Sequence, residues 1–348
     1  MGLIPQRDYF DKDIANSDNT SGYYIIEQNN FVYNPRKSSD APYGPISRYA
    51  YPDAGIVSPL YLCFRAKGNV DTSFFEWYFR SSAWHRYIYM TGDSGARHDR
   101  VSIKDDDFFS MPIRFPSAIE QKKIAAFLNT IERRITSQQL FVDNLKKYKR
   151  GVVQKFFSEK EMAQWETVKL KDVVDIFDGT HQTPNYKSEG VRFISVENIL
   201  NPLSTEKYIS NDDYRKEFKV HPEYGDVLMT RIGDIGRTCY VNFNIDMAYY
   251  VSLALFKCSS KIDGRYLAAY ISTNDFQKEL WERTLHIAFP KKINTGEIGE
   301  CVIRLPNIAR QIAISDQLDL IERVIRLTEK QYELLRAIRD GFMQQLFI

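Results

Sequence analysis

The side chains best suited to recognise another molecule lie in loops broken by glycine and proline. One such loop reads DGTHQTPNYK over residues 178–187, and another reads RIGDIGR over residues 231–237. A pair of lysines follows the segment IAFP near residue 290. The candidate side chains in this part of the chain are His181, Gln182, Thr183, Asn185, Tyr186, Lys187, Arg231, Arg237, Lys291 and Lys292.

Two comparable loops occur nearer the N-terminus, YNPRKSS at residues 33–39 and SGARHDR at residues 94–100. Lysine and arginine neutralise phosphates, while arginine also pairs with guanine, and asparagine or glutamine with adenine. These loop groups therefore suit a nucleic-acid duplex, although a solvated or structural role is the plainer alternative for any single member. The candidates here are Asn34, Arg36, Lys37, Ser94, Arg97, His98 and Arg100.

Residues for enzymatic or metal chemistry form no recognisable pattern. The five histidines lack metal-ligand spacing, and the sequence has neither an H-E-x-x-H motif nor a P-loop. The run Asp105–Asp107 could hold a nuclease metal, but an acidic loop explains it more simply. YNPRK lacks the second proline and the aromatic residue of an amino-methyltransferase signature. We therefore expect a chain without catalytic residues or a metal site.

Two long segments must position these loops, because the chain contains an internal repeat. EQKKIAAFLNTIERRI at residues 120–135 returns as RQIAISDQLDLIERVI at residues 310–325. The two copies align without a gap at a spacing of 190 positions, so that the final Phe157 matches Phe347. A gapless match of this length indicates a duplication.

Both copies carry apolar residues at alternating steps of four and three, which predicts the seam of a coiled coil. Polar residues interrupt the seam at matching places, Gln138 with Thr328 and Lys149 with Arg339. The predicted seam residues are Ile124, Leu128, Ile131, Ile135, Val142, Leu145, Val152, Phe156, Ile314, Leu318, Ile321, Ile325, Tyr332, Leu335, Phe342 and Leu346.

These segments are predicted to form helices that pair with each other, because they share their interruptions. Helices of about 40 residues are roughly 60 Å long, well beyond the usual globular helix. Ser117 with Glu120 predicts a capping box before the first helix, and Asn307 is the expected cap of the second. Separate packing of each helix on its own domain, or pairing with a second molecule, is the alternative.

The remaining segments are rich in aromatic and β-branched residues and predict mixed α and β structure. Residues 224–241 predict strand, glycine turn and strand, while residues 71–88 and 263–281 each predict a helix after the matching strands LYLCFRAK and LALFKC. Both domains are therefore diverged repeats. We predict an α+β chain of four parts: a domain at 1–115, a helix at 116–158, a domain at 159–305 and a helix at 306–348.

On these motifs the chain resembles the specificity (S) subunits of type I restriction–modification systems. The resemblance rests on FPSAIEQKKIAAFLNTIERRI with its counterpart LPNIARQIAISDQLDLIERVI, on the closings KKYKRGVVQKFF and RAIRDGFMQQLF, and on WETVKLKDVVDIFDGTHQTPNY. It covers essentially the whole chain. It implies two mixed α/β target-recognition domains joined by two long helices forming an antiparallel coiled coil.

The resemblance also implies a function. Each target-recognition domain would contact one half of a bipartite site in double-stranded DNA, and the helices would set the spacing and bind two modification (methyltransferase) subunits. S-adenosylmethionine and ATP are expected in partner subunits, among them the restriction subunits of the full complex. This chain itself is expected to hold no cofactor and to catalyse nothing.

One departure from the family pattern concerns the first domain. WETVKLKDVV, which opens the second domain at Trp165, would have its counterpart before residue 1. The first domain is therefore expected to be shortened at its N-terminus. Two alternatives stay open: a truncated or recombined S-subunit copy with one competent recognition domain, and a coiled-coil scaffold whose domains bind proteins. An enzyme carrying these domains is disfavoured by the missing motifs.

Composition is that of a globular protein, with 43% hydrophobic and 26% charged residues and a net charge of +2. The small net charge gives no indication of a nucleic-acid partner, but the local distribution of charge matters more than the net charge. We expect no membrane segment, because no run of about 18 apolar residues exists. The four scattered cysteines favour reduced thiols in a cytoplasmic protein.

Overall fold

The computed structural model describes residues 2–9, 11, 20–92 and 99–347, without the side chain of Arg7. The chain divides into two compact units. Unit 1 comprises Met1–Phe141 with Thr328–Ile348, and unit 2 comprises Val142–Leu327. Because these units cut across both long helices, the four-part division made from the sequence stays a prediction.

Unit 1 is built on a three-stranded antiparallel sheet in the order β3–β2–β5, formed by Ile46–Arg48, Phe31–Tyr33 and Leu62–Phe64. A separate antiparallel pair joins β1 (Tyr24–Ile26) to β4 (Gly55–Val57). A 3₁₀ turn, η1 (Gln6–Asp8), precedes these strands, and the helices of the domain are α1 (Thr72–Arg80), α2 (His85–Thr91) and α3 (Asp105–Phe109). The core is aromatic, with buried Phe31, Tyr33, Phe74, Phe79, Trp84 and Phe108.

Unit 2 contains a four-stranded antiparallel sheet in the order β11–β10–β13–β7, formed by Thr238–Tyr240, Val227–Thr230, Leu253–Cys258 and Val174–Asp178. A second sheet has the order β12–β8–β9 (Met247–Tyr249, Val191–Ile194 and Tyr208–Ile209), and β6 (Glu166–Lys169) pairs with β14 (Val302–Leu305). The predicted strand, glycine turn and strand at 224–241 is confirmed by the β10–β11 pair. Helices and 3₁₀ turns connect these strands: α5 (Glu159–Met162), η2 (Leu170–Asp172), η3 (Pro202–Ser204), α6 (Asn211–Glu217), α7 (Gly264–Ile271), α8 (Asn274–Arg283) and α9 (Thr295–Glu300).

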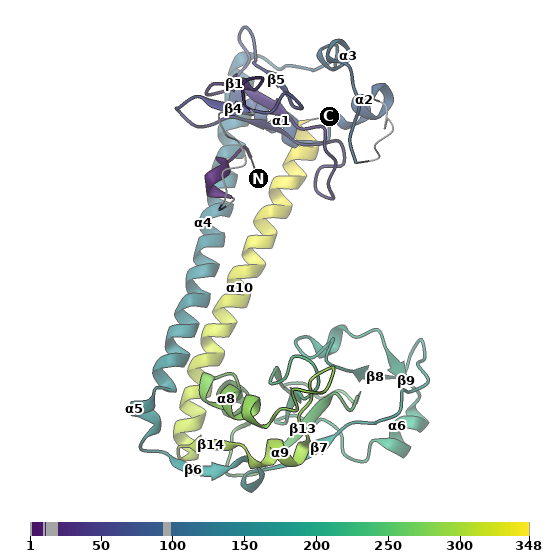
Figure 1. Cartoon of the computed structure of the whole chain (residues 1–348), viewed down its shortest axis with the longest axis vertical. Helices are drawn as coiled ribbons and strands as arrows, with labels where there is room; N and C mark the ends of the chain where they lie inside the picture. The colour runs from purple at the N-terminus through teal and green to yellow at the C-terminus, as the bar shows by residue number, and fades with distance from the viewer. Residues whose placement is uncertain (1, 10, 12–19, 93–98, 348) are drawn as a thin grey trace. The chain divides into compact units, whose positions relative to one another are not determined.

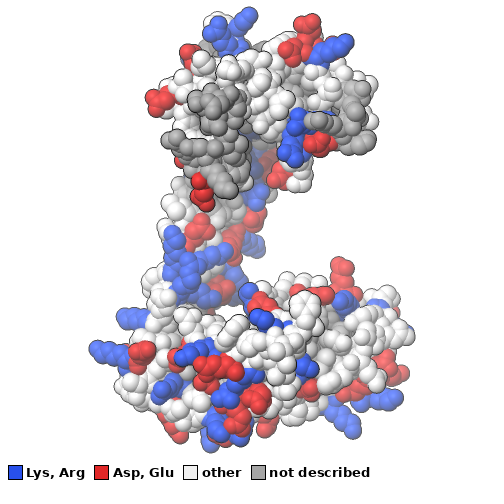
Figure 2. All heavy atoms as spheres, in the orientation of Figure 1, with Lys and Arg blue, Asp and Glu red and all other residues white. Residues whose placement is uncertain are grey.

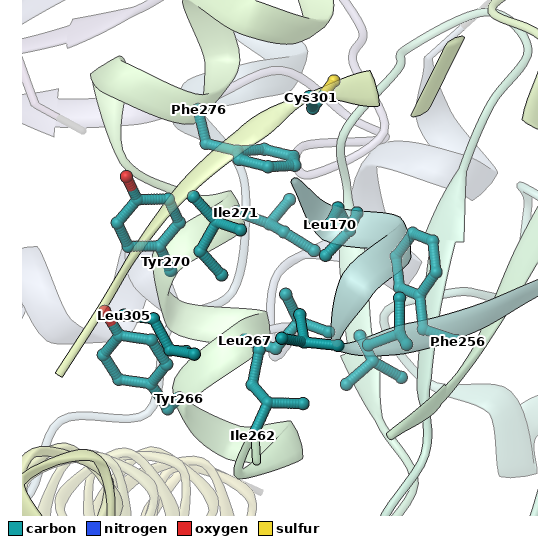
Figure 3. Close-up of a cluster of buried hydrophobic side chains, with 14 of the residues drawn as sticks. Leu170, Phe256, Ile262, Tyr266, Leu267, Tyr270, Ile271, Phe276, Cys301 and Leu305 are labelled. Carbon is teal, nitrogen blue, oxygen red and sulfur yellow. The ribbon is translucent and has the colours of Figure 1, made fainter. Parts of the chain in front are cut away.

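The main core of unit 2 lies between α7 and the four-stranded sheet. Figure 3 shows Phe256 of β13 and Leu267 of α7 among the clustered side chains, with Leu170 close by. Leu170, Phe256 and Leu267 are fully buried. Burying side chains of this size contributes about 1.5–3 kcal/mol each relative to exposure.

Two helices predicted from the sequence are each interrupted, which corrects the prediction. Residues 71–88 form α1 and α2, because Ser81 adopts an extended backbone (ψ 174°) and ends α1. Residues 263–281 fall in α7 and α8, because Thr273 is also extended (ψ 153°) and its side chain caps α8 by accepting from the N–H of Phe276. Serine and threonine at these points compete with the helical backbone.

The long helices α4 (Ala118–Phe156) and α10 (Ile308–Leu346) lie side by side and antiparallel within each unit (Figure 1). In unit 1, Glu132 Oε2 of α4 lies 3.1 Å from Arg339 Nη1 of α10. In unit 2, Lys149 of α4 forms an ion pair with Glu322 of α10. These two pairs are equivalent in the repeat, so the basic interruption of each helix, Lys149 or Arg339, meets a glutamate of the other helix.

The other polar interruption of the seam, Gln138 of α4, contacts its own repeat equivalent, Thr328 of α10. Gln138 donates from Nε2 to the carbonyl of Thr328 at 3.1 Å, and to Oε1 of Gln331 at 3.1 Å. The two helices therefore meet at matching positions of the duplication. The predicted caps are also confirmed: Ser117 and Glu120 exchange the bonds of a capping box, and Asn307 Oδ1 accepts from the N–H of Arg310 at 2.9 Å.

Most predicted seam residues lie away from solvent. Ile314 and Leu318 belong to the core of unit 2, and Ile124 and Phe342 pack against the core of unit 1, so the outer parts of the seam face the domains as well. Leu346 is the exception, at 36% exposed near the helix end. The fully buried members are Leu128, Ile135, Val142, Ile314, Leu318 and Ile325, and the partly buried ones are Ile124, Ile131, Leu145, Val152, Phe156, Ile321, Tyr332, Leu335 and Phe342.

A duplicated glutamine holds the domain of each unit to a long helix. In unit 1, Gln121 of α4 accepts at Oε1 from the N–H of Asp71 (2.9 Å) and donates to the carbonyl of the proline before its own helix (2.9 Å). In unit 2, Gln311 of α10 makes the same bonds, with the N–H of Asp263 at 2.9 Å and with the preceding proline at 2.8 Å. Asp71 caps α1 and Asp263 caps α7. The duplicated glutamine therefore fixes the start of the equivalent domain helix in each unit.

The end of the other long helix completes each attachment. Phe347, directly after α10, packs on Phe74 of α1 with ring centroids 5.5 Å apart. Phe157, directly after α4, packs on Tyr266 of α7 at 5.7 Å. Each domain helix is therefore bound by the beginning of one long helix and the end of the other.

The units differ at the edge of their sheets. β7 extends the sheet of unit 2 and β6 pairs with β14, whereas the described part of unit 1 has no strand equivalent to β6 or β7. Phe115 in unit 1 is 43% exposed, while its repeat equivalent Leu305 in β14 is 9% exposed. No helix among the described residues is long and apolar enough to cross a membrane.

Candidate nucleic-acid interface

The loop after β7 leaves the sheet at a position where only glycine fits. A side chain at Gly179 would place its Cβ 2.1 Å from the carbonyl oxygen of Tyr249. The next residue, Thr180, bridges to Tyr250, and the N–H of Val251 donates to the carbonyl of Thr180 at 3.0 Å. This close approach fixes where the following loop begins.

The candidates in this loop are exposed. His181 Nε2 lies 3.0 Å from Asp178 Oδ2, and its side chain is 71% exposed. Tyr186 is 41% exposed, and its ring packs on Phe193 at 5.6 Å. The backbone N–H of Lys187 donates to the carbonyl of Tyr208, and the lysine side chain is exposed to solvent. The other exposed candidates of the loop are Gln182, Thr183 and Asn185.

Arg231 lies at the end of β10 and is 7% exposed. Its guanidinium donates to the carbonyl of Ile293 at 3.1 Å and to that of Val251 at 2.8 Å, and lies 3.6 Å from the carboxylate of Asp178. Burial lowers the pKa of Arg231, and the charge of Asp178 partly offsets this effect. Unlike the other candidates of unit 2, Arg231 is therefore placed to hold loops together, with its donors directed at the protein.

The glycine turn after Arg231 meets the loop that follows α8. Gly233 has a φ of +83° and its N–H donates to the carbonyl of Lys291 at 2.8 Å. The N–H of Leu285 donates to the carbonyl of Lys292 at 2.8 Å. Both lysine side chains are exposed, and the ammonium of Lys291 lies 4.8 Å from the centroid of the Trp281 ring.

The guanidinium of Arg231 therefore contacts Asp178 and Ile293, the residues next to loops 179–187 and 285–292, and we call residues 179–187, 231–237 and 285–292 the basic loop cluster. Arg237 lies in the same cluster; its Nε donates to Asp234 Oδ2 at 2.8 Å and its side chain is 56% exposed. The cluster presents imidazole, amide, ammonium and guanidinium groups from separate parts of the chain. These groups can bind phosphates and the edges of bases.

The candidates of unit 1 form a smaller group. Asn34 Oδ1 accepts from the N–H of Arg36 at 3.0 Å, and the guanidinium of Arg36 lies 3.8 Å from the carboxylate of Asp99. Lys37 donates its N–H to Asp99, and Arg100 bridges to Arg36. The backbone therefore brings Asn34, Arg36, Lys37 and Arg100 together. Ser94, Arg97 and His98 lie outside the described residues.

Charges of both signs alternate over the face shown in Figure 2, so no single-sign field covers it. Among the described residues no group of three or more His, Cys, Asp and Glu side chains could hold a metal ion. All four cysteines are free thiols. Burial raises the pKa of Cys258 and of Cys301 to about 12 each, which keeps both thiols protonated.

Two exposed apolar features were missed by sequence reasoning. Ile287 and Phe289 in the loop after α8 are 99% and 104% exposed. The signal was present in the stretch IAFPKK, where large apolar residues stand next to proline and lysines in a loop. On α10 an apolar row lies outside the predicted seam, and its members Leu320, Leu327, Leu334 and Ile338 are 63%, 60%, 60% and 41% exposed.

Comparison with known proteins identifies relatives of this chain. Residues 162–337 match the family described as type I restriction modification DNA specificity domain. The specificity subunit of the type I restriction enzyme MjaVIII from Methanocaldococcus jannaschii is 25% identical over 264 residues, 69% of this chain and 62% of that protein. The chain therefore spans about three fifths of the length of this curated relative.

Solved structures share the fold. One, from a study of complex assembly and conformational transition of the type I restriction–modification system, gives a TM-score of 0.61 at 18% identity, covering 93% of this chain and 82% of that chain. The HsdS subunit from Thermoanaerobacter tengcongensis gives 0.52 at 18%, covering 93% and 81%. The S subunit from M. genitalium gives 0.56 at 14%, covering 97% and 87%.

Proposed function

Because the chain belongs to the type I restriction modification DNA specificity family, we propose that it is the DNA sequence-recognition subunit of a type I restriction–modification complex. The observation that carries this proposal is the basic loop cluster, where three loops of unit 2 are tied to one buried arginine. The family is generally non-catalytic. We propose the same for this chain, with S-adenosylmethionine and ATP bound by partner subunits.

In this proposal some side chains of the basic loop cluster contact phosphates and others contact base edges. Lys187, Lys291 and Lys292 contact phosphates, which supplies affinity without sequence preference. Gln182, Asn185 and Arg237 contact base edges, where amides suit adenine and guanidinium suits guanine. Arg231 contacts no DNA, because its donors serve the backbone of Val251 and Ile293.

Unit 1 would contact the other half of a bipartite target through Asn34, Arg36, Lys37 and Arg100, together with Ser94, Arg97 and His98. A second candidate is a recombined subunit in which unit 2 alone is competent. The described part of unit 1 brings together only Asn34, Arg36, Lys37 and Arg100, a smaller group than the basic loop cluster, and this favours the second candidate. A bipartite methylation motif supports the first version, whereas a palindromic motif supports the second.

We propose that α4 and α10 form an antiparallel coiled coil joining the two domains, setting the spacing of the half-sites. Each helix has 39 residues, which is about 58 Å at 1.5 Å per residue and less than two turns of B-DNA at about 34 Å each. The seam pairs in both units support this proposal, because Glu132–Arg339 and Lys149–Glu322 follow one antiparallel register.

The outer faces of the long helices are proposed to bind two modification subunits, and restriction subunits join in the full complex. Leu320, Leu327 and Leu334 recur every seven residues on α10, as expected of a face that receives another helix. Their repeat equivalents on α4 are Thr130, Ser137 and Asn144, so the second modification subunit would use other residues there. Exposed Leu140, Phe141 and Tyr148 are available on α4.

The test is to express the chain with its cognate modification subunit and to map methylated positions across a genome. The proposal predicts methylation at one recurring motif that disappears when this chain is omitted. A purified chain that methylates or cleaves DNA alone would establish an enzyme instead. Binding of DNA that does not weaken as salt rises would favour a protein-binding scaffold, since phosphate contacts are strongly salt-dependent.

A further inference from the structure

We propose, resting on the DNA-recognition function above, that Ile287 and Phe289 form an apolar wedge that enters a DNA duplex between base steps. Their side chains are 99% and 104% exposed, the highest values among the large hydrophobic side chains of the described residues. The next highest value is 73%. Isoleucine and phenylalanine are among the residue types most often fully buried, so the full exposure of two of them in one loop is unusual.

The loop that carries the wedge is tied down at its base. The N–H of Leu285 donates to the carbonyl of Lys292 at 2.8 Å, and the N–H of Ile293 donates to the carbonyl of Arg231 at 3.0 Å. Behind the tip, His286 Nε2 lies 2.9 Å from the carbonyl of Trp281, and the two rings are 4.1 Å apart. The loop is therefore held by backbone hydrogen bonds at its base and by the contact of the His286 and Trp281 rings behind its tip.

The charged residues around the wedge indicate which kind of partner it would enter. Lys291 and Lys292 follow the wedge after Pro290, and the N–H of Gly233 in the glycine turn donates to the carbonyl of Lys291. A partner for this tip must offer negative charge outside and an apolar interior. A duplex has this order of layers, because phosphates enclose stacked bases. Proteins that deform DNA insert Phe and Ile side chains between base steps in this way.

The wedge adds a contribution that base-edge contacts do not supply. Inserting a ring unstacks one step, so sequences with flexible pyrimidine–purine steps at that point accept it at a lower energetic cost. The tip would therefore favour such a step without a hydrogen bond to any base. It would also place the deformed step next to the amide side chains of loop 179–187, since both loops are bonded to the surroundings of Arg231.

The experiment uses the full chain in complex with its modification subunits. Equilibrium binding to duplexes that carry the methylated motif would be measured over a range of salt for wild type, Phe289→Ala and Ile287→Ala. Ile245→Ala is the matched control, because Ile245 is 46% exposed and follows the end of β11 opposite the glycine turn. Duplexes with 2-aminopurine at successive positions report unstacking by a rise in fluorescence.

We expect Phe289→Ala to weaken binding about tenfold and Ile287→Ala less, with an unchanged slope of affinity against salt, because no phosphate contact is lost. Lys291→Ala with Lys292→Ala should instead reduce that slope by about two units, at roughly 0.9 per contact. The 2-aminopurine signal should appear at one step with wild type and disappear with Phe289→Ala. Ile245→Ala should match wild type in both measurements.

Three results would overturn the wedge. If Phe289→Ala binds DNA like wild type and leaves the fluorescence unchanged, the tip does not enter the duplex, although the recognition function stands. If Phe289→Ala instead loses the modification subunit while the remaining chain binds DNA normally, the tip is a protein-docking surface. If wild type itself shows no salt-dependent binding, the proposed function and the wedge both fail. Since both side chains are exposed, each variant should melt like wild type.

Discussion

In unit 1 Asp71 caps the domain helix α1 and is bound by Gln121, and in unit 2 Asp263 caps the domain helix α7 and is bound by Gln311. Around these equivalent helices the rest differs. Unit 1 packs a three-stranded sheet on an aromatic core, while unit 2 adds β7, a second sheet and the loop at 179–187.

This comparison shows that the residues that attach a domain to the long helices are different from the residues available for recognition. The attachment is buried and made of backbone hydrogen bonds and packed rings, so a substitution there is costly. The loops are exposed and bonded mainly through their backbone, so their side chains can change without loss of the fold. A duplicated frame can thus carry two different recognition surfaces.

The largest expected effect concerns the aromatic attachment. Phe157→Ala should destabilise the protein by about 3–4 kcal/mol, because its ring is buried and the site cannot collapse around rigid tyrosines. Phe347→Ala should cost less, because the end of α10 can shift. Urea unfolding checks both, with Phe141→Ala as a control at an exposed position. If Phe157→Ala costs no more than the control, the attachment proposed for unit 2 is wrong.

The glutamine pair should give the next largest effect. Gln311→Leu leaves the N–H of Asp263 and the carbonyl of Lys261 without their partner and should cost about 2–3 kcal/mol. Gln121→Leu breaks one bond fewer among those found and should cost about 1–2 kcal/mol. Thermal melting of each variant tests the order. A larger loss for Gln121→Leu would contradict the equivalence drawn between the two attachments.

Arg231 should affect DNA binding through the position of the loops. Arg231→Met removes the guanidinium that joins Val251, Ile293 and Asp178, and should weaken DNA binding about tenfold, or about 1.4 kcal/mol. Arg231→Lys should recover only part of this loss, because lysine lacks the planar fork. Hydrogen exchange of residues 179–187 should rise in Arg231→Met. Unchanged exchange with weaker binding would mean that Arg231 contacts DNA directly.

The smallest expected effect concerns the ion pairs of the long helices. Burial alone raises the pKa of Glu132, but hydrogen bonds and charges from Arg80 and Arg339 outweigh it and lower the pKa overall. Its stabilisation is therefore present above the pKa of an ordinary glutamate, about 4.3, and is lost as the pH falls through the lower folded value. Glu132→Gln should remove up to about 1 kcal/mol at neutral pH and flatten the acid limb of the stability curve. An acid limb identical to that of wild type would contradict this.

The long helices were predictable because their information is local and duplicated. The four-three spacing placed Leu128, Ile135, Ile314 and Ile325 in the interior, and the caps at Ser117 and Asn307 follow from side-chain chemistry at the helix starts. The identity of Gln121 with Gln311 was visible in the repeat. Its role was not, because the partners Asp71 and Asp263 are far away in sequence.

The candidate site was less predictable for the same reason. An arginine in a glycine-rich turn looks exposed in sequence, yet Arg231 is buried because loops distant in sequence close over it. The helix breaks at Ser81 and Thr273 were overlooked because the apolar pattern continues through them. The exposure of Phe289 was indicated only by the proline and lysines that follow it in IAFPKK, since composition alone favours a buried aromatic ring.

The most direct test of DNA recognition changes unit 2 alone and maps methylation with the cognate modification subunit. Gln182→Ala with Asn185→Ala should relax base preference in one half of the methylated motif, while the other half and the spacing between them stay as in wild type. Asn201→Ala, another exposed amide of unit 2, serves as the control. A motif that is unchanged in both halves would contradict the assignment of recognition to the basic loop cluster.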